Sequence, residues 1–344
     1  MIIRRFENKD YQSLIDFNCK NFNKRDKIEE SIIHRFFNNP FSVKDKSDIL
    51  IAIDDRGEII GQILVMLSEF NHEGNVYPAF LGMDYFVTKE ARNSLAGIRI
   101  ANKYKDLKFN LGIGLTDASL AIMRAFNVPV VGYMSKYIKL TNIFSILKFL
   151  LASKIKTQSK FAPPGSINLK GGRFVRVFNA DELISETGYW NKNLLEFTRC
   201  KAFINWRFYS YPDKYFVYRY FTHNSENNSI PNYFVVRPII WKNSNCLLLV
   251  DYRFDPELKS MFNNILNSVG KLSQELKMAA TITECSLPEC EVDLKRNLFF
   301  KFGRKMEIVS KYPINLNKNE SEKNSILVTF ADSDGDFYYG NDKW

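Results

Sequence analysis

The sequence has little of what marks secreted, metal-binding or membrane-spanning proteins. Its 344 residues include only three histidines and five cysteines, and no two cysteines form a CxxC pair. An odd number of widely spaced cysteines predicts reduced core residues, so we expect neither a disulfide framework nor a metal site. No apolar run follows the first arginines, and none reaches the roughly 18–20 residues that cross a bilayer. We therefore expect an intracellular, cytoplasmic protein.

Acidic residues are missing from one long segment. Between Ala118 and Ala180 there is no Asp or Glu, whereas ten lysines and arginines lie there, which accounts for the whole net charge of +10. Such a local positive field attracts an anionic partner: a phosphorylated cofactor, a nucleotide-linked or lipid-linked substrate, an anionic membrane surface or RNA. A solvated basic face without a specific partner is the alternative.

The patterns that are present predict two α/β domains, for which a chain of this length suffices. The first part is predicted to have strands at 1–6, 49–54, 58–68, 76–87, 109–116, 128–134 and 136–140, and helices at 10–22, 27–38, up to about 107, and 118–126. The second part repeats much of this order, with strands at 233–240, 246–252, 279–285, about 306–309 and 326–330, and helices at 257–277 and 291–302.

A weak internal repeat at an offset of 167 residues supports a duplication. Asp84-Tyr85 matches Asp251-Tyr252, and three single identities follow at the same offset. Between 141 and 172 the composition turns apolar with lysines and then linker-like. We predict a mixed-sheet α/β fold with one domain over 1–140, a basic linker or helix over 141–180, and a second domain over 181–344.

The stretch MDYFVTKEARNSLAGIRIANKYKDL, residues 83–107, resembles the acyl-CoA-binding motif of the GNAT acyltransferase superfamily. LGIGLTDASLAIMRAFNVPVVGYMSKY resembles the strand, helix and strand that close that fold. The resemblance covers the first 140 residues and, more faintly, 233–330. It implies two tandem GNAT-like domains, the second degenerate. Acyltransferases associated with surface polysaccharide synthesis, in which stretches like NWRFYSYP and TFADSDGD recur, and Fem-type aminoacyltransferases share the double arrangement.

The resemblance implies an acyl-CoA site in the first domain. A strand ending at Val87 leads to a helix start, whose N–H groups and dipole favour pyrophosphate. The family pattern Arg/Gln-x-x-Gly-x-Gly/Ala becomes Arg92-Asn93-Ser94-Leu95-Ala96-Gly97, with Leu95 in place of the middle glycine. These six residues with Phe86 and Val87 are expected to bind acetyl-CoA or another acyl-CoA as co-substrate.

The equivalent stretch of the second half, 255–264, contains no glycine and has an acid where the phosphates would lie. We therefore expect the second domain not to bind CoA and to shape the acceptor site instead.

Acyl transfer from a thioester to an amine needs a neutral amine, a polarised carbonyl and a proton for the thiolate. Asp84, on the strand beside the thioester, is the first candidate for the general base. A hydrogen-bonding residue at a strand separation is its alternative role. The family's tyrosine acid is replaced by Met123, so Tyr85, Tyr133 or a residue of the second domain is expected to act as acid, or the thiolate to leave unassisted.

Acceptor contacts are predicted from the second domain, because aromatic faces with flanking carboxylates suit sugars. The candidates are Trp206, Arg207, Asp251 and Tyr252, with Asp117 of the first domain as a weaker one. A core role for the aromatic residues and a helix N-terminal role for Asp117 are the alternatives.

We therefore expect an acyl-CoA-dependent N-acyltransferase acting on an amino sugar, nucleotide-linked or lipid-linked, in surface polysaccharide synthesis. Peripheral membrane contact is predicted through 142–160, and a buried helix is the alternative. A Fem-type aminoacyltransferase that uses aminoacyl-tRNA is one alternative, although nucleic acid is not the expected partner because no RNA-binding motif is present. A GNAT-like binding subunit without catalysis is the other.

Overall fold

The computed structural model describes residues 1–23, 25, 27–42, 48–72, 74–107, 109–141, 161–183, 194–211, 215–222, 231–255, 258, 260–311, 325–333 and 335–336. The chain divides into two compact units. The first contains Met1–Tyr133 and Met306–Asn324, and the second contains Met134–Lys305 and Ser325–Trp344.

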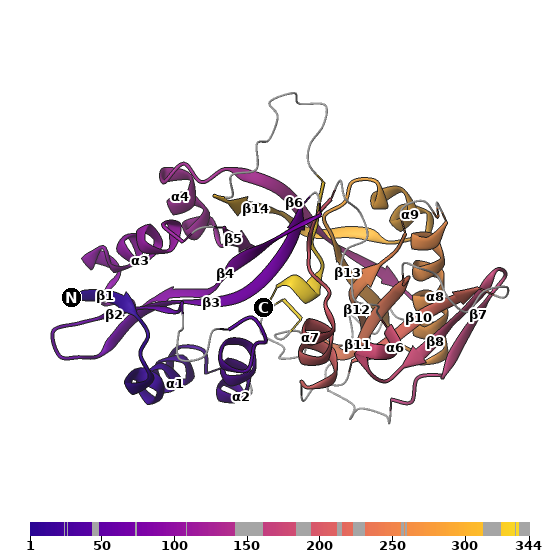
Figure 1. The fold of residues 1–344 in the computed structure, drawn as a ribbon, viewed down its shortest axis with the longest axis horizontal. Coiled ribbons are helices and arrows are strands. Elements are labelled where there is room, and N and C mark those ends of the chain that lie inside the picture. Colours follow the sequence, from indigo (N-terminus) through magenta and orange to yellow (C-terminus); the bar gives the residue numbers. More distant parts are fainter. Residues whose placement is uncertain are drawn as a thin grey trace. The chain divides into compact units, whose positions relative to one another are not determined.

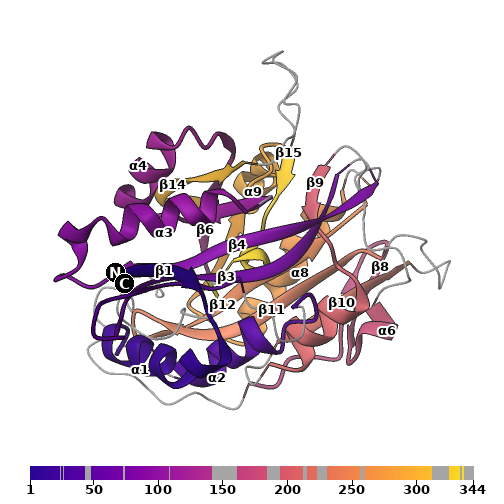
Figure 2. The ribbon, with the colours of Figure 1, turned by 60° about the vertical axis from the view of Figure 1, so that its left-hand side comes forward.

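The first unit is a mixed sheet covered by helices on both faces (Figures 1 and 2). Its strand order is β1-β2-β3-β4-β5-β14, and only β4 and β5 are parallel neighbours. Helices α1 and α2 lie on one face and α3 and α4 on the other. The bounds are β1 Ile2–Arg5, α1 Tyr11–Asn21, α2 Ile28–Ile32, β2 Leu50–Ile53, β3 Ile59–His72, β4 Asn75–Val87, α3 Ala96–Lys105, β5 Asn110–Ile113, α4 Asp117–Ala125 and β14 Phe300–Ser310.

The sequence explains this layering. Strand β3 is buried along most of its length, as expected for a strand with helices on both faces. Helix α3 buries Ala96, Ile100, Ala101 and Tyr104, which recur at helical spacing and therefore form one apolar face.

The strands of the second unit pair in the order β6-β13-β12-β11-β10-β8-β7, with β12 and β13 parallel. A further pair, β9 and β15, is parallel. The apolar face of the long helix α8 belongs to the main core of this unit. The bounds are β6 Val130–Leu140, β7 Ser166–Leu169, β8 Gly172–Val177, α6 Ala180–Leu183, β9 Leu194–Phe197, α7 Lys201–Ile204, β10 Phe216–Thr222, β11 Tyr233–Trp241, β12 Ser244–Arg253, α8 Met261–Glu275, β13 Ala280–Cys285, α9 Cys290–Arg296 and β15 Ser325–Leu327.

The two units share one plan, and each is completed by a strand from the other half of the chain. An antiparallel pair is followed by a helix and a parallel strand in both, as β3-β4-α3-β5 and as β11-β12-α8-β13. After α4 the chain enters β6, which pairs with β13 through Ser135–Leu140, whereas β14 returns to pair with β5. The predicted mixed α/β fold is confirmed, and the compact units differ from the predicted ranges because of this exchange.

Two predicted elements were wrong in detail. Residues 130–140 form the single strand β6, where two strands were predicted over 128–134 and 136–140. The helix predicted over 291–302 ends at Arg296, because Leu298 has a φ of 61° and Phe300 already belongs to β14.

The apolar, lysine-bearing segment 142–160, predicted to dock on a membrane, lies outside the described residues. No helix in the described part of the chain has both the length and the apolar character needed to span a bilayer.

Candidate functional site

Strands β4 and β5 pair over a short stretch and then separate. The register joins Phe80 to Asn110 and Leu81 to Leu111. Beyond Leu81, the pairs that β4 forms in the described residues are with β3. A strand edge without a neighbouring strand accepts extended ligands by backbone hydrogen bonding. The end of β4 therefore offers a binding edge for an extended, amide-bearing molecule.

Tyr104 of α3 lies where the two strands separate. Its hydroxyl oxygen is 2.7 Å from the Phe80 carbonyl oxygen and 2.9 Å from that of Leu111, and it accepts a hydrogen bond from the Gly82 N–H at 2.8 Å. Burial raises the pKa of Tyr104 well above its usual range, so the hydroxyl keeps its proton. A Cβ on Gly82 would lie 2.8 Å from the Tyr104 ring. The close contact between the Tyr104 ring and β4 thus requires glycine at position 82.

The loop after β4 enters α3 in a conformation that favours anion binding. Arg92–Ser94 form a 3-10 turn, and no side chain caps the N-terminus of α3 in the described residues. The N–H groups of the first helical turn lack intrahelical partners, and the helix dipole attracts negative charge to them. Residues 88–105 also carry five basic residues against one acid, Glu90. The geometry fits a diphosphate.

Leu95 has a backbone conformation that favours glycine. Its φ is 60° and its ψ is 11°, in the left-handed region, and its side chain is 55% exposed. A residue with a Cβ is disfavoured there by roughly 1–2 kcal/mol, whereas glycine is not. The loop therefore has, at Leu95, the left-handed conformation in which glycine is the unstrained residue.

Replacing Leu95 with glycine is expected to raise the free energy of unfolding by about 0.5–1 kcal/mol, since relief of the left-handed strain exceeds the entropic cost of glycine. Urea denaturation of the full chain measures this. Leu107→Gly, on a residue outside the left-handed region, serves as the control and should be destabilising. A Leu95→Gly protein less stable than the wild type would contradict the assigned strain.

Neighbouring side chains at the end of β4 point to two faces of the sheet. The Tyr85 hydroxyl reaches the first turn of α3, where a Cβ on Gly97 would lie 2.7 Å from it. Phe86 faces α1 instead, with its ring centroid 6.0 Å from that of Phe17 and 5.3 Å from that of Phe22. Burial raises the pKa of Tyr85 to about 12. Gly97 thus serves the close contact between α3 and β4.

The Asp84 carboxylate lies on the face opposite Tyr85, between two arginines. Nη1 of Arg25 is 2.7 Å from one of its oxygens, and Nη2 of Arg35 is 3.6 Å from the other. The Asp84 side chain is 4% exposed. A general base must lie within hydrogen-bond reach of the proton it takes, and here both oxygens face guanidinium groups. The contacts favour the alternative role of Asp84, a hydrogen-bonding residue at the strand separation.

Asp117 is the exposed first residue of α4. The helix is capped by Thr116, whose hydroxyl accepts the Ser119 N–H at 3.2 Å.

The residues predicted to bind acyl-CoA before α3 differ in exposure: Arg92, Asn93, Ser94 and Leu95 are exposed, whereas Ala96 is buried. The Ser94 hydroxyl donates to the carbonyl oxygen of Ala91 at 2.6 Å.

The predicted acceptor residues Trp206, Arg207, Asp251 and Tyr252 belong to the buried interior of the second unit. Arg207 donates to the Tyr215 hydroxyl at 2.7 Å and forms an ion pair with Asp336. The Tyr252 hydroxyl donates to the carbonyl oxygen of Glu284 at 3.1 Å. These contacts give Arg207 and Tyr252 partners inside the second unit. The burial of Trp206 and Tyr252 favours the core alternative for the aromatic residues.

Arg35 was not among the predicted site residues, although a sequence signal marks it. His34-Arg35-Phe36-Phe37 and Trp206-Arg207-Phe208-Tyr209 align at an offset of 172, each three residues before a proline. Each run lies in a π-helical turn, Ile33–Phe37 and Asn205–Tyr209, with the arginine in the middle and buried. Such turns are frequent at functional sites. The turn of the first unit directs Arg35 to Asp84.

Comparisons with known proteins identify the fold. No family model and no curated sequence matches the chain. Among solved structures, a probable N-acyltransferase from Enterococcus faecalis is 10% identical over 89% of this chain and 71% of its own, with a TM-score of 0.55. A GCN5-related N-acetyltransferase from Anabaena variabilis is 11% identical over 89% and 72%, with a TM-score of 0.54.

N-myristoyltransferase of Saccharomyces cerevisiae, solved with bound myristoyl-CoA, is 12% identical over 90% of this chain and 82% of its own, with a TM-score of 0.55. These similarities show the GNAT fold across both units. They confirm the fold class that the sequence predicts.

Proposed function

We propose that this protein is an acyl-CoA-dependent N-acyltransferase whose first unit binds the acyl-CoA. The observation that carries the proposal is the uncapped N-terminus of α3, with Leu95 in the left-handed conformation, beside the separated edge of β4. The helix end suits the diphosphate, and the strand edge suits the amides of pantetheine. The similarly folded yeast enzyme was solved with bound myristoyl-CoA, which supports an acyl-CoA as the co-substrate.

The chemistry needs no covalent intermediate on the protein. The backbone N–H groups at the end of β4 would orient the thioester and polarise its carbonyl. Stabilisation of the developing negative charge on a carbonyl oxygen by such positioned donors is usually the largest single contribution to the rate of acyl transfer. The acceptor amine would attack the carbonyl carbon, the C–S bond would break, and the thiolate would take the proton that the amine loses. We propose an amino sugar, nucleotide-linked or lipid-linked and destined for surface polysaccharide, as the acceptor.

Titration calorimetry with acetyl-CoA, followed by a thiol-release assay with a panel of amino sugars, tests the proposal. Binding and thiol release that depend on the amino sugar would support it. Binding of aminoacyl-tRNA without binding of acetyl-CoA would point to the Fem-type alternative, and binding of neither to a non-catalytic subunit.

Asp84→Asn separates the two roles of Asp84 in the same assay. We expect this variant to lose stability by about 1–3 kcal/mol, because two guanidinium groups lose their carboxylate, while thiol release below its melting temperature falls less than about tenfold. A stable variant whose thiol release drops by several orders of magnitude would instead identify Asp84 as the general base.

A further inference from the structure

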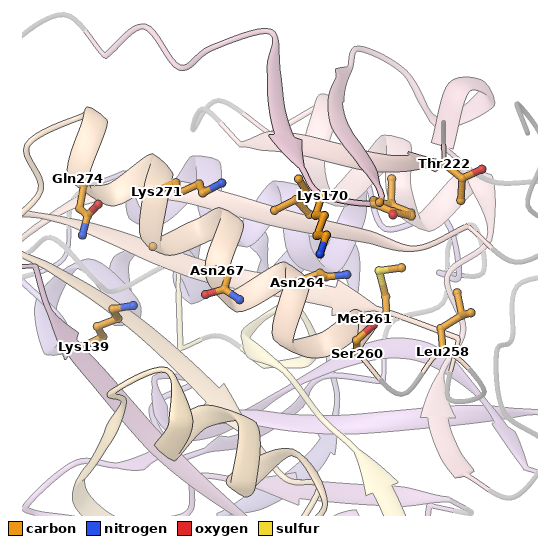
Figure 3. A pocket seen from close by; sticks show the side chains of 14 residues that line it. Lys139, Lys170, Thr222, Leu258, Ser260, Met261, Asn264, Asn267, Lys271 and Gln274 are labelled. Atoms are coloured by element: carbon orange, nitrogen blue, oxygen red, sulfur yellow. The ribbon is translucent and has the colours of Figure 1, made fainter. Parts of the chain in front are cut away.

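The second unit contains an open groove of about 880 Å³ between α8 and the β7–β8 hairpin (Figure 3). Residues of β6, β10, the hairpin and α8 line it, and all belong to the second unit. Small-molecule sites commonly have volumes of roughly 300–1,000 Å³. The groove is therefore large enough for a ligand of the size of a sugar phosphate.

One face of α8 supplies a polar stripe to this groove. Ser260, Asn264, Asn267, Lys271 and Gln274 recur every three or four residues, which places them on the same side of the helix. The apolar residues of α8 face the core on the other side. Amide side chains provide both donors and acceptors, as hydroxyl-rich ligands require.

Three lysines from separate elements give the groove a positive charge. They are Lys139 of β6, Lys170 of the hairpin turn and Lys271 of α8, and none of the fourteen described lining residues is acidic. Lys271 donates to the carbonyl oxygen of Asn168 at 3.1 Å, which ties the helix to the hairpin. Figure 3 shows Lys170 extending from the hairpin toward α8. Two of the lysines come from the acid-free segment that carries the net charge of the chain.

The Lys139 amine lies close to α8 at Gly270. A Cβ on Gly270 would lie 3.0 Å from the Lys139 amine, so glycine leaves room for that amine against α8. Burial lowers the pKa of Lys139, which indicates an ammonium group partly withdrawn from water. A partly desolvated cation gains more from an anionic partner than an exposed one.

We infer that this groove binds a small, hydroxyl-rich molecule that carries one or two phosphate groups. The amines of Lys139, Lys170 and Lys271 face the phosphates and the amides of α8 face the hydroxyls. Lysines act as compact point charges on phosphate, whereas planar carboxylates are matched better by arginine, which is absent from the described lining. The site lies wholly in the second unit and does not rest on the activity proposed for the first.

Titration calorimetry of the full chain with glucose 1-phosphate, and separately with inorganic pyrophosphate, tests the inference. Lys139→Met, Lys170→Gln and Lys271→Gln should each weaken binding about tenfold, the loss expected for one charge-assisted contact. Lys295→Gln, an exposed lysine of α9 in the same unit, is the matched control and should leave affinity unchanged. Equal affinity of the groove variants and this control would overturn the inference.

Gly270→Ala tests the groove without removing a charge. The new Cβ displaces the Lys139 amine and should weaken binding severalfold, although alanine favours the helix and the variant should melt no earlier than the wild type. A second arm compares flotation with phosphatidylcholine vesicles with and without phosphatidic acid. Binding to the soluble phosphates indicates a free ligand, and binding only to phosphatidic acid vesicles through the same lysines indicates a lipid-linked one. Absence of binding in both arms would refute the site.

Discussion

Asp251→Asn is expected to lower the free energy of unfolding by about 3–5 kcal/mol, because it removes the shared partner of buried cations. The Asp251 carboxylate accepts hydrogen bonds from Arg199 at 2.9 and 3.0 Å and from Arg253 at 2.9 Å. The hydroxyls of Tyr233 and Thr329 each donate to it at 2.8 Å. Asparagine has the same shape, so the loss reflects charge and hydrogen bonding and not a cavity.

Chemical denaturation measures this effect, with Asp181→Asn as the control. Asp181 forms a 2.6 Å ion pair with Lys201 in the same unit but is 77% exposed, and its loss should cost less than about 1 kcal/mol. If Asp251 instead serves only to bind the acceptor, as the sequence predicts, its replacement should leave stability unchanged and reduce activity alone.

The pH dependence of stability gives a second readout of the same group. Burial alone would raise the pKa of Asp251, but the charges of Arg199 and Arg253 outweigh it and hold the pKa well below its usual range. A lowered pKa contributes stability that is complete above the unfolded value of roughly 3.9 and is lost as the pH falls through the folded value. The difference in the free energy of unfolding between the wild type and Asp251→Asn should therefore shrink below about pH 4. A difference that stays constant with pH would contradict an ionised Asp251 in the folded protein.

The duplicated aspartate shows what the sequence could and could not reveal. The match of Asp84 with Asp251 was visible at an offset of 167, and both carboxylates bind an arginine that precedes a helix, Arg25 and Arg199. Side-chain pairing of this kind depends on contacts distant in sequence, which local patterns do not encode. The sequence therefore predicted a catalytic role for Asp84 and an acceptor contact for Asp251, but it could not predict the ion pairs with Arg25 and Arg199.

The loop that we propose to bind acyl-CoA, 88–97, was predictable for the opposite reason. Its strand, turn and helix are consecutive in sequence, so local signals suffice to place Arg92 and Gly97. The exchange of β6 and β14 was not predictable, because the alternating pattern of a strand specifies its faces but not which strand lies beside it. The role of Tyr104 was likewise not predictable. In the sequence it is one residue of an apolar helix face, and only the structure shows that it lies where β4 and β5 separate.

Gly97→Ala is expected to weaken acetyl-CoA binding tenfold to a hundredfold. The added Cβ would lie 2.7 Å from the Tyr85 hydroxyl, and a tyrosine ring is rigid, so relief requires a shift of α3 away from β4. Overpacking of this kind costs about 1–3 kcal/mol, and each 1.4 kcal/mol corresponds to roughly tenfold in affinity. Titration calorimetry with acetyl-CoA measures the change.

Tyr85→Phe supplies both the rescue and the test of the proposed acid. Without the hydroxyl, the nearest remaining side-chain atom outside the Tyr85 ring would be Cγ2 of Val87 at 3.4 Å, an ordinary contact. The double variant Gly97→Ala with Tyr85→Phe should therefore regain most of the affinity. If the Tyr85 hydroxyl only spaces α3 from β4, the single variant Tyr85→Phe should retain thiol release. If the hydroxyl protonates the thiolate, turnover should fall by roughly a hundredfold or more while acetyl-CoA binding persists, and Tyr85 would be identified as the acid.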